Sequence, residues 1–477
     1  MIGPIHLSAQ TEGPEGAFHK AYVWLAAAAG ALGGLLFGYD WVVIGGAKPF
    51  YERFFQLDSP SLEGWAMSCA IVGCLAGAVS SGPLGNRFGR KRLLTLAALV
   101  FAASSLGIAL AAHFAAFVAW RMLGGYAIGL ASGISPMYIA EISPAHLRGR
   151  LVSLNQLAIV FGILLAQLVN WLIARPVPPG ATAHEILLSW NGQWGWRWMF
   201  GVTAIPSILF LIATFPVPES PRWLASKGRK QQAFGVLRRL GSEAYARQVM
   251  DNFAAASEAQ PQLSVWRQIS APSLKKALLL GVLLAVLQQW CGINVIFNYA
   301  QEVFSAAGYQ VSAILFNIVV TGAVNVVFTL VALAAIDRYG RRFLLLIGVS
   351  GLAIVYTLLG ILYRLHCKGL PMLMLVLAAI AFYAVSLAPA TWVVISEIFP
   401  NRIRSSAMSV AVTSLWAACF LLTYTFPLLN AALGAGGTFL TYAVICLAGL
   451  FFLYLRLPET RNKTLEEIET SLRTGKF

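Results

Sequence analysis

Charged residues are scarce in this sequence. Asp, Glu, Lys and Arg make up 11% of the 477 residues, whereas hydrophobic residues make up 58%. This composition is that of an integral membrane protein rather than a soluble one. The first apolar run starts LAAAAGALGG but is too long for a signal peptide, so we expect a retained helix. Runs of spanning length predict twelve membrane helices, at about residues 22–46, 62–84, 93–112, 114–141, 151–174, 196–216, 274–300, 311–335, 343–363, 371–398, 405–429 and 435–456.

Cysteine and histidine are also scarce, with six residues of each. The cysteines are scattered and lack the spacing of metal ligands, so we expect no disulfide and no metal site. The histidines are dispersed, mostly near span ends or loops, and no catalytic triad can be recognised. These absences disfavour a membrane enzyme, and we expect no cofactor.

Acidic residues are outnumbered by basic ones, 19 against 34. A net charge of +15 could suggest a nucleic-acid partner, but the placement of the charges argues against one. With both termini inside, most Lys and Arg residues lie on the inner side, and the outer side holds Lys48, Arg53, Arg175, Arg197, Arg364 and Lys368. This is the positive-inside pattern. We therefore expect a multi-pass protein of a cell membrane, favouring a bacterial inner membrane, with both termini cytoplasmic.

Three motifs occur twice at a nearly constant offset. GNRFGRKR at 85–92 matches DRYGRR at 337–342, the stretch that ends in Glu141 matches the one that ends in Glu397, and PESPRW at 218–223 matches PETRNK at 458–463. The repeats predict two homologous six-span halves, 22–217 and 274–456, between tails at 1–21 and 457–477. The polar segment 218–273 is expected to link them through short amphipathic helices. Two halves with a cleft between them suit alternating access.

The seventh span contains the polar stretch QQWCGINVIFNY, residues 288–299. On a straight helix Asn294 would point roughly 140° away from Gln289, but Gly292 can unwind the turn between them and bring both amides inward. Broken spans with polar groups near the midplane hold substrates in transporters. Because the amides are neutral, we expect a neutral polyol as the substrate. The alternative is that these amides join neighbouring helices.

The duplicated motifs, together with FGYD at 37–40, SPMYIAEISPAHLRG at 135–149 and QQWCGIN, resemble the major facilitator superfamily and its sugar porter family over nearly the whole chain. Within that family they resemble the bacterial D-xylose/proton symporters. The resemblance implies an all-α fold of twelve membrane helices with the sugar between the halves. It implies sugar contacts from Gln167, Gln288, Gln289, Asn294 and Trp392, apolar walls from Phe37 and Trp416, and a further candidate at Asn325.

The chain departs from the family pattern at several site positions. Leu415 stands where an amide is common, and Asn298 stands where an aromatic residue is usual. Tyr383 replaces a common phenylalanine, and Ala388 replaces a glycine. We count Asn298 and Tyr383 among the candidate sugar contacts. Since one unmatched hydrogen-bonding group costs about 1–3 kcal/mol, the class of substrate carries over better than the particular sugar.

Two ionisable residues, Asp40 and Arg121, lie inside predicted spans. Asp40 is about six residues, or roughly 9 Å, from the outer end of the first span, and Arg121 lies at a similar depth in the fourth. Their matching depths predict an ion pair, and separation of the pair would favour the protonated carboxylate. The resemblance likewise implies proton coupling at Asp40. A permanent structural salt bridge is the alternative, and the sixth span lacks the carboxylate that some proton-coupled relatives carry near Thr203.

Acidic and basic residues gather at the inner ends of the spans in both halves. We interpret them as a cytoplasmic gate that holds the halves together when the inner side is shut; the alternative is static surface pairing. The expected gate residues are Arg87, Arg90, Glu141, Arg148, Glu219, Arg338, Arg341, Glu397, Arg402 and Glu459.

The sequence thus predicts a proton symporter that imports a neutral monosaccharide, a pentose or hexose with a xylose-like sugar favoured. A passive sugar uniporter is the first alternative. A sugar sensor is the second, although both predicted tails are short. We expect a monomer whose partners are the sugar, the proton and the lipid bilayer.

Overall fold

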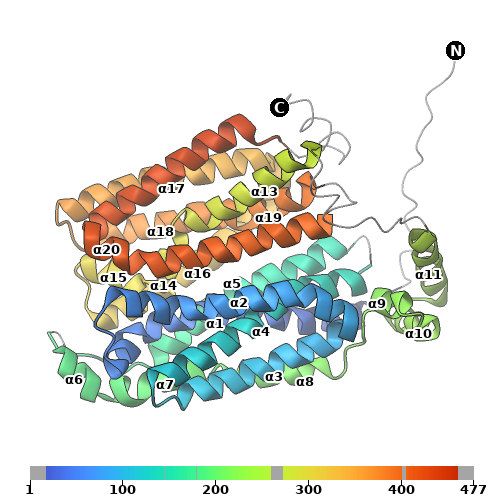
Figure 1. The fold of residues 1–477 in the computed structure, drawn as a ribbon, viewed down its shortest axis with the longest axis horizontal. Coiled ribbons are helices and arrows are strands. Elements are labelled where there is room, and N and C mark those ends of the chain that lie inside the picture. Colours follow the sequence, from blue (N-terminus) through green and yellow to red (C-terminus); the bar gives the residue numbers. More distant parts are fainter. Residues whose placement is uncertain (1–17, 145–146, 179, 259–271, 400–403, 460–477) are drawn as a thin grey trace.

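The computed structural model describes residues 18–144, 147–178, 180–258, 272–399 and 404–459 (Figure 1). Their helices are α1 (Lys20–Phe55), α2 (Pro60–Phe88), α3 (Arg90–Ala109), α4 (Phe114–Ile142), α5 (Arg148–Ile173), α6 (Ala183–Leu188), the π-helical turn η1 (Asn191–Gly195), α7 (Trp196–Gly201), α8 (Ala204–Thr214), α9 (Pro221–Ser226), α10 (Lys230–Leu240), α11 (Glu243–Glu258), α13 (Pro272–Trp290), α14 (Ile293–Asn298), α15 (Ala300–Ala306), α16 (Val311–Tyr339), α17 (Arg341–Arg364), α18 (Leu370–Val385), α19 (Leu387–Ile398) and α20 (Arg404–Arg456).

The prediction of twelve membrane spans is confirmed. Among the described residues, eleven segments are long and apolar enough to cross a membrane. The last of them, Ala407–Arg456, has 50 residues and would extend about 75 Å as one helix, more than twice the apolar thickness of a bilayer. Gly434, with φ 67°, is non-helical and divides α20 into two spans. The break falls between the predicted spans 405–429 and 435–456.

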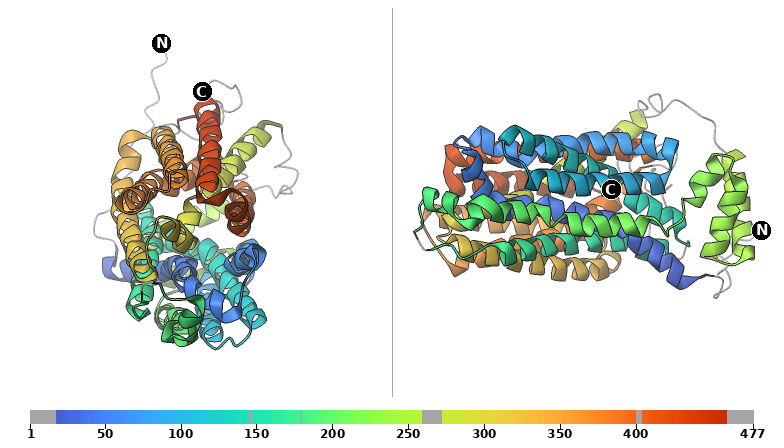
Figure 2. Two further views of the ribbon diagram at one scale, coloured as in Figure 1. Left: turned by 90° about the vertical axis from the view of Figure 1, so that its left-hand side faces the viewer. Right: turned by 90° about the horizontal axis from the view of Figure 1, so that it is seen from below.

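The helices form two bundles that lie side by side. Helices α1 to α8 form the first half and α13 to α20 the second, and the two separate clearly in Figures 1 and 2. The halves meet where α2 packs on α20, α5 packs on α16, and α1 packs on α14 and α15. Helices α9 to α11 project beyond one end of the bundle, as expected for the linker. We call that end the linker end and the opposite end, beside α6, the far end.

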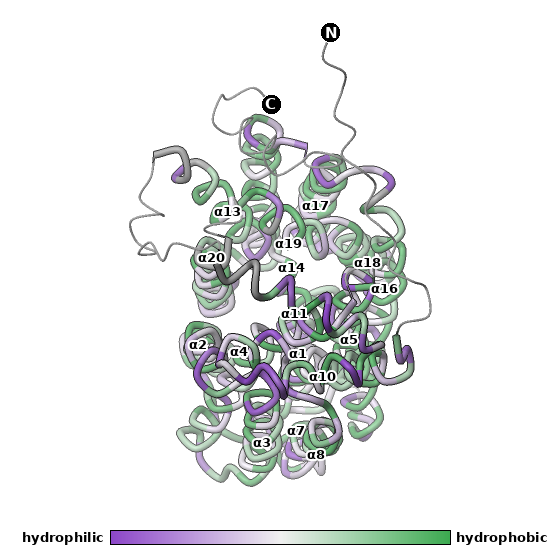
Figure 3. Tube along the Cα trace, turned by 90° about the vertical axis from the view of Figure 1, so that its right-hand side faces the viewer, coloured by the Kyte–Doolittle hydropathy of each residue, from purple (hydrophilic) through white to green (hydrophobic). Residues whose placement is uncertain are grey.

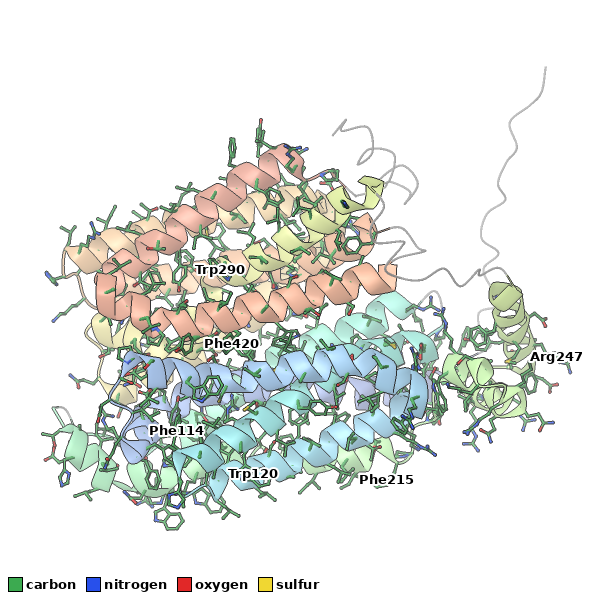
Figure 4. The ribbon with its side chains drawn as sticks, viewed as in Figure 1. Phe114, Trp120, Phe215, Arg247, Trp290 and Phe420 are labelled. Carbon is green, nitrogen blue, oxygen red and sulfur yellow. The ribbon has the colours of Figure 1, made fainter. Side chains whose placement is uncertain are left out.

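The outer surface of the bundle is apolar along its length. Figure 3 shows hydrophobic segments around its perimeter, and Phe215, labelled in Figure 4, is 66% exposed. An exposed apolar surface of this extent is suited to lipid rather than to water. By contrast, Arg247 lies on α11, outside the bundle (Figure 4), where it pairs with Glu243.

Close helix packing inside the first half depends on glycine. A Cβ at Gly125 on α4 would lie 1.9 Å from the Ala70 carbonyl oxygen of α2, and one at Gly38 on α1 would lie 1.9 Å from the Ile159 carbonyl oxygen of α5. Small residues let membrane helices approach closely and gain dispersion contacts. This packing fixes the part of α1 that carries Phe37, Asp40 and Trp41.

Candidate transport site

The predicted break in the seventh span is confirmed. Helix α13 ends at Trp290 and α14 begins at Ile293, with Gly292 between them at φ 87°. Glycine adopts this left-handed conformation without the steric cost that a side chain would add. A Cβ at Gly292 would also lie 2.8 Å from the Tyr442 ring, so both backbone conformation and packing require glycine.

The break brings the amides into one hydrogen-bonded chain. Asn294 Nδ2 donates to Gln289 Oε1 at 2.5 Å, Gln289 Nε2 donates to Gln288 Oε1 at 2.7 Å, and Gln288 Nε2 donates to the Tyr383 hydroxyl at 3.1 Å. All three amides are buried. The chain is uncharged and connects α14, α13 and α18, so it presents neutral donors and acceptors between helices of the second half.

Gln167 is the amide of the first half that sequence reasoning placed among the sugar contacts. It lies on α5 and its side chain extends towards α16. A Cβ at Gly322 on α16 would lie 2.0 Å from Gln167 Oε1. Neither Gln167 Oε1 nor Nε2 has a hydrogen-bond partner among the described residues, although both atoms are buried. Asn325 is buried one turn further along α16. A buried amide without partners costs free energy, and a hydroxyl-rich ligand would satisfy it.

Aromatic rings from the two halves meet one another. The rings of Phe37 and Trp416 lie 5.9 Å apart, and Trp41 lies 5.9 Å from Trp416 and 6.2 Å from Phe37. Phe37 and Trp416, the two apolar walls that the resemblance implied, are therefore in contact with each other, and Trp41 is a third ring that sequence reasoning missed. The feature of the sequence that could have identified Trp41 is its position next to Asp40. Trp392, on α19, is half-buried against the core.

The predicted Asp40–Arg121 ion pair is confirmed. Arg121 Nη1 lies 3.0 Å from Asp40 Oδ2, and both residues are 3% exposed. Helices α1 and α4 hold the pair, and the Arg121 guanidinium also lies 5.5 Å from the centre of the Phe200 ring. Pairing compensates part of the large cost of burying each charge.

Asn298 lies beside this ion pair. It ends α14, is 4% exposed, and lines a small cavity together with Asp40, Trp41 and Arg121. Sequence reasoning grouped Asn298 with the sugar contacts because of its place in the seventh span. The structure places Asn298 next to the Asp40–Arg121 pair, which this grouping did not anticipate.

The linker end carries matching ion pairs in the two halves. Arg90 Nε lies 2.9 Å from Glu141 Oε2, and Arg341 Nη2 lies 3.3 Å from Glu397 Oε1. Each pair lies within one half. The duplicated motifs therefore build the same contact twice.

The remaining predicted gate residues repeat the same symmetry. Glu219 accepts the backbone N–H of Arg90, and Glu459 accepts that of Arg341. Arg87 lies over the Phe88 ring and Arg338 over the Tyr339 ring. Arg148 Nε donates to the Ala140 carbonyl at 3.1 Å, and Arg402 lies outside the described residues. Burial raises the pKa of Tyr245 on α11, and the Arg148 guanidinium opposes that shift, which places Arg148 next to the linker.

A second charged cluster, at the far end, was missed by sequence reasoning. Lys48 on α1 is 1% exposed and contacts Glu302 on α15, Glu52 at 2.7 Å and Glu63 at 3.6 Å. We call these four residues the far-end cluster. Sequence reasoning treated Lys48 only as an outer topogenic charge; its signal was the Lys48–Glu52 spacing of one helical turn directly after an apolar run.

The far-end cluster connects the two halves. Lys48 belongs to the first half and Glu302 to the second. A second polar contact lies at the same end, where the Val177 N–H donates to Ser312 Oγ at 3.1 Å. A Cβ at Gly64 on α2 would lie 2.5 Å from the Tyr424 carbonyl of α20. The halves therefore meet tightly at the far end.

Comparison with known proteins identifies the family. The family model described as "Sugar (and other) transporter" matches residues 26–472. The chain belongs to this family. It is 36% identical to the D-xylose-proton symporter of Escherichia coli (strain K12), over 95% of this chain and 96% of that protein. It is 37% identical to the arabinose-proton symporter of Bacillus subtilis (strain 168), over 94% of each, and 38% identical to the glucose transport protein of a Synechocystis strain, over 94% and 97%.

Solved structures of the Escherichia coli xylose transporter XylE share the fold. The inward open conformation aligns with a TM-score of 0.83 at 35% identity, covering 94% of this chain and 99% of that one. The same transporter bound to 6-bromo-6-deoxy-D-glucose aligns at 0.77 and 35% identity, covering 95% and 99%. The sugar transporter family thus accounts for residues 26–472 of the chain.

Proposed function

We propose that this protein imports a neutral monosaccharide together with a proton by alternating access, with the linker end facing the cytoplasm of a bacterial cell. The observation that carries the proposal is the buried carboxylate–guanidinium pair Asp40–Arg121, whose cavity is also lined by Asn298, an amide of the broken seventh span. Ionisable residues inside membrane spans are functional-site candidates by default, and proton relays are among the functions that they serve. Relatives named as xylose-proton and arabinose-proton symporters support the same function.

The amide chain supports a sugar as the substrate. Gln289 and Asn294 present neutral hydrogen-bonding groups, and Trp416 offers a ring face on which a sugar can stack. Leu415 is buried beside Trp416 and offers no hydrogen bond to a hydroxyl. The relatives are named for different sugars, namely xylose, arabinose and glucose. They therefore support a monosaccharide, pentose or hexose, and the preference for a xylose-like sugar rests on the resemblance to the D-xylose/proton symporters.

The contacts between the halves support alternating access. The far end is joined by Lys48–Glu302, whereas the two pairs described at the linker end, Arg90–Glu141 and Arg341–Glu397, each lie within one half. The TM-score is 0.83 with the inward open structure of XylE and 0.77 with its complex with the sugar analogue. This difference supports an inward open state for the present structure. We propose that the far-end cluster is the outer gate and that the linker-end clusters form the inner gate when the protein turns outward.

A sugar-competition panel in proteoliposomes, with and without a proton gradient, tests the function. Uphill accumulation that depends on the gradient would support symport. Equilibration without accumulation would make the protein a uniporter. Sugar binding without any flux in vesicles that contain only this protein would identify a sensor.

The amide chain gives a first prediction. Gln289→Ala or Asn294→Ala is expected to weaken sugar binding by about 1–3 kcal/mol, roughly tenfold to a hundredfold in Kd, because each change leaves sugar hydroxyls without a partner. Isothermal titration calorimetry on the purified protein measures the loss.

Asn170→Ala is the matched control. Asn170 is also a buried amide, but it donates to the Val43 carbonyl and holds α5 against α1. The Asn170→Ala variant should have lower thermal stability but a sugar affinity within about threefold of wild type. Unchanged affinity in both site variants would return the amides to a purely structural role.

The inner gate gives a second prediction. Glu397→Arg places a positive charge against Arg341 and should destabilise the closed inner gate, as should Arg148→Glu. The population is expected to shift towards the inward-open state and transport to slow, with little change in intrinsic sugar affinity. Spin-label distances across the linker end should lengthen on average.

Glu243→Arg supplies the control for charge reversal. Its pair with Arg247 lies on α11 and is exposed, and exposed pairs contribute about 0–1 kcal/mol. The distance distribution of this variant should match wild type. If the Glu397 and Arg148 variants also match wild type, the linker-end charges are not a gate.

A further inference from the structure

Two residues that line the cavity beside the Asp40–Arg121 pair each carry a buried polar atom that lacks a partner within the described part of the chain. Arg121 Nε and Asn298 Oδ1 are both buried without a hydrogen-bond partner among the described residues, and both residues line the cavity. The first atom is a donor and the second an acceptor. The cavity volume of about 10 Å³ is close to the space that one water molecule requires.

The two atoms belong to different halves of the protein. Arg121 lies on α4 of the first half and Asn298 on α14 of the second. Helix α14 is held against α1 backbone to backbone, since a Cβ at Gly45 would lie 2.8 Å from the Phe297 carbonyl and 3.1 Å from that of Asn298. Any opening of the far end that moves α14 away from α1 therefore removes Asn298 from the cavity.

We propose that Asn298 is a positioning residue for proton coupling, whose amide oxygen binds a water that the Arg121 Nε–H also binds. This water links the position of α14 to the state of the ion pair. With α14 in place, Arg121 is shared between the water and Asp40, and solvent is kept from the pair on this side. With α14 displaced, the pair is exposed to protons from outside. The inference rests on the proposed proton symport and extends it to a specific residue of the seventh span.

Other titratable groups surround the pair and do not change in the experiment below. Tyr39 and Tyr51 face it from α1, and Cys69 and Cys74 face it from α2. Tyr51 also interacts electrostatically with Glu52 and Glu302 of the far-end cluster. A change at Asn298 therefore acts on a pair whose remaining charged surroundings stay constant.

Two substitutions at Asn298 should move the pH dependence of transport in opposite directions. Asn298→Leu removes the acceptor, so Arg121 interacts more fully with Asp40 and holds it ionised to lower pH. Asn298→Asp adds a carboxylate that competes for Arg121 and repels the charge on Asp40. We expect the pH of half-maximal sugar-driven proton uptake to fall in the first variant and rise in the second, each by about one unit.

The measurement is sugar-induced proton uptake in proteoliposomes across a pH series, with sugar affinity measured by calorimetry on the same samples. Asn298→Gln keeps an amide oxygen and should stay nearer to the wild-type profile than either other variant. Gln289→Ala should lower affinity without moving the profile. A purely structural role would reduce the rate in every variant but would not separate the two midpoints.

The outcomes distinguish this inference from the proposed function. Unmoved midpoints in folded Asn298→Leu and Asn298→Asp proteins overturn the positioning role. Unmoved midpoints with a loss of affinity of tenfold or more instead make Asn298 a sugar ligand only. If wild-type protein transports sugar without taking up protons, the symport proposal fails, and the inference fails with it.

Discussion

Asp40→Asn is expected to bind sugar and equilibrate it across the membrane while losing both uphill accumulation and sugar-induced proton uptake. The amide preserves the shape of the side chain next to Arg121 but cannot exchange a proton. One proton that moves down about 100 mV gains roughly 2.3 kcal/mol, and one pH unit adds about 1.4 kcal/mol. Together they support accumulation of several hundred-fold, and the variant should lose all of it.

In the same proteoliposomes, counterflow measures the equilibration of sugar and gradient-driven uptake measures its uphill accumulation. Asp58→Asn provides a control with the same chemical change, because Asp58 is exposed in the loop between α1 and α2. It should accumulate sugar like wild type. Accumulation that persists in Asp40→Asn would rule out Asp40 as the coupling site and leave the ion pair with a structural role.

Lys48→Met is expected to destabilise the closed far end strongly. It removes the cation and leaves Glu52, Glu63 and Glu302, which have carboxylate oxygens within 4.8 Å of one another. Removing one partner of a buried ion pair costs about 3–5 kcal/mol, which corresponds to a shift of a hundredfold or more in the equilibrium between closed and open outer gates. Label distances across the far end should lengthen, and transport should slow.

A double-mutant cycle separates the contact between the halves from the stability of each half. Adding Glu302→Gln to Lys48→Met removes one of the stranded carboxylates, so the double variant should be shifted less than the sum of the single variants. Arg53→Met is the control, because Arg53 donates to the Pro49 carbonyl of its own helix. Additive effects of the Lys48 and Glu302 substitutions would show that the two residues do not act together as a gate.

Much of the fold could be predicted from local sequence. Membrane thickness sets the length of each apolar run, so the spans follow from hydropathy. Helix α20 contains two of the predicted spans and is broken between them at Gly434. The break at Gly292 follows from glycine chemistry together with the spacing of the amides around it. The Asp40–Arg121 pair follows from two charges at equal depth, since a buried charge requires a partner.

The duplicated motifs also determined the linker-end chemistry. Because the two halves repeat the same residues, Arg90–Glu141 and Arg341–Glu397 form the same contact in each half. Sequence alone left open whether such charges pair within a half or between halves. That choice depends on the conformational state, and only the packed structure shows that here each pair stays within its own half.

The contacts between the halves were decided by tertiary structure. Lys48 and Glu302 are separated by 254 positions, and no local periodicity relates them. The contact of Trp41 with Trp416 and the position of Asn298 at the cavity beside Arg121 likewise follow from no local periodicity. Hydropathy and motif spacing act within a helix or a repeat, whereas these contacts depend on the register at which two independent bundles pack, which is set by the summed shape of both surfaces.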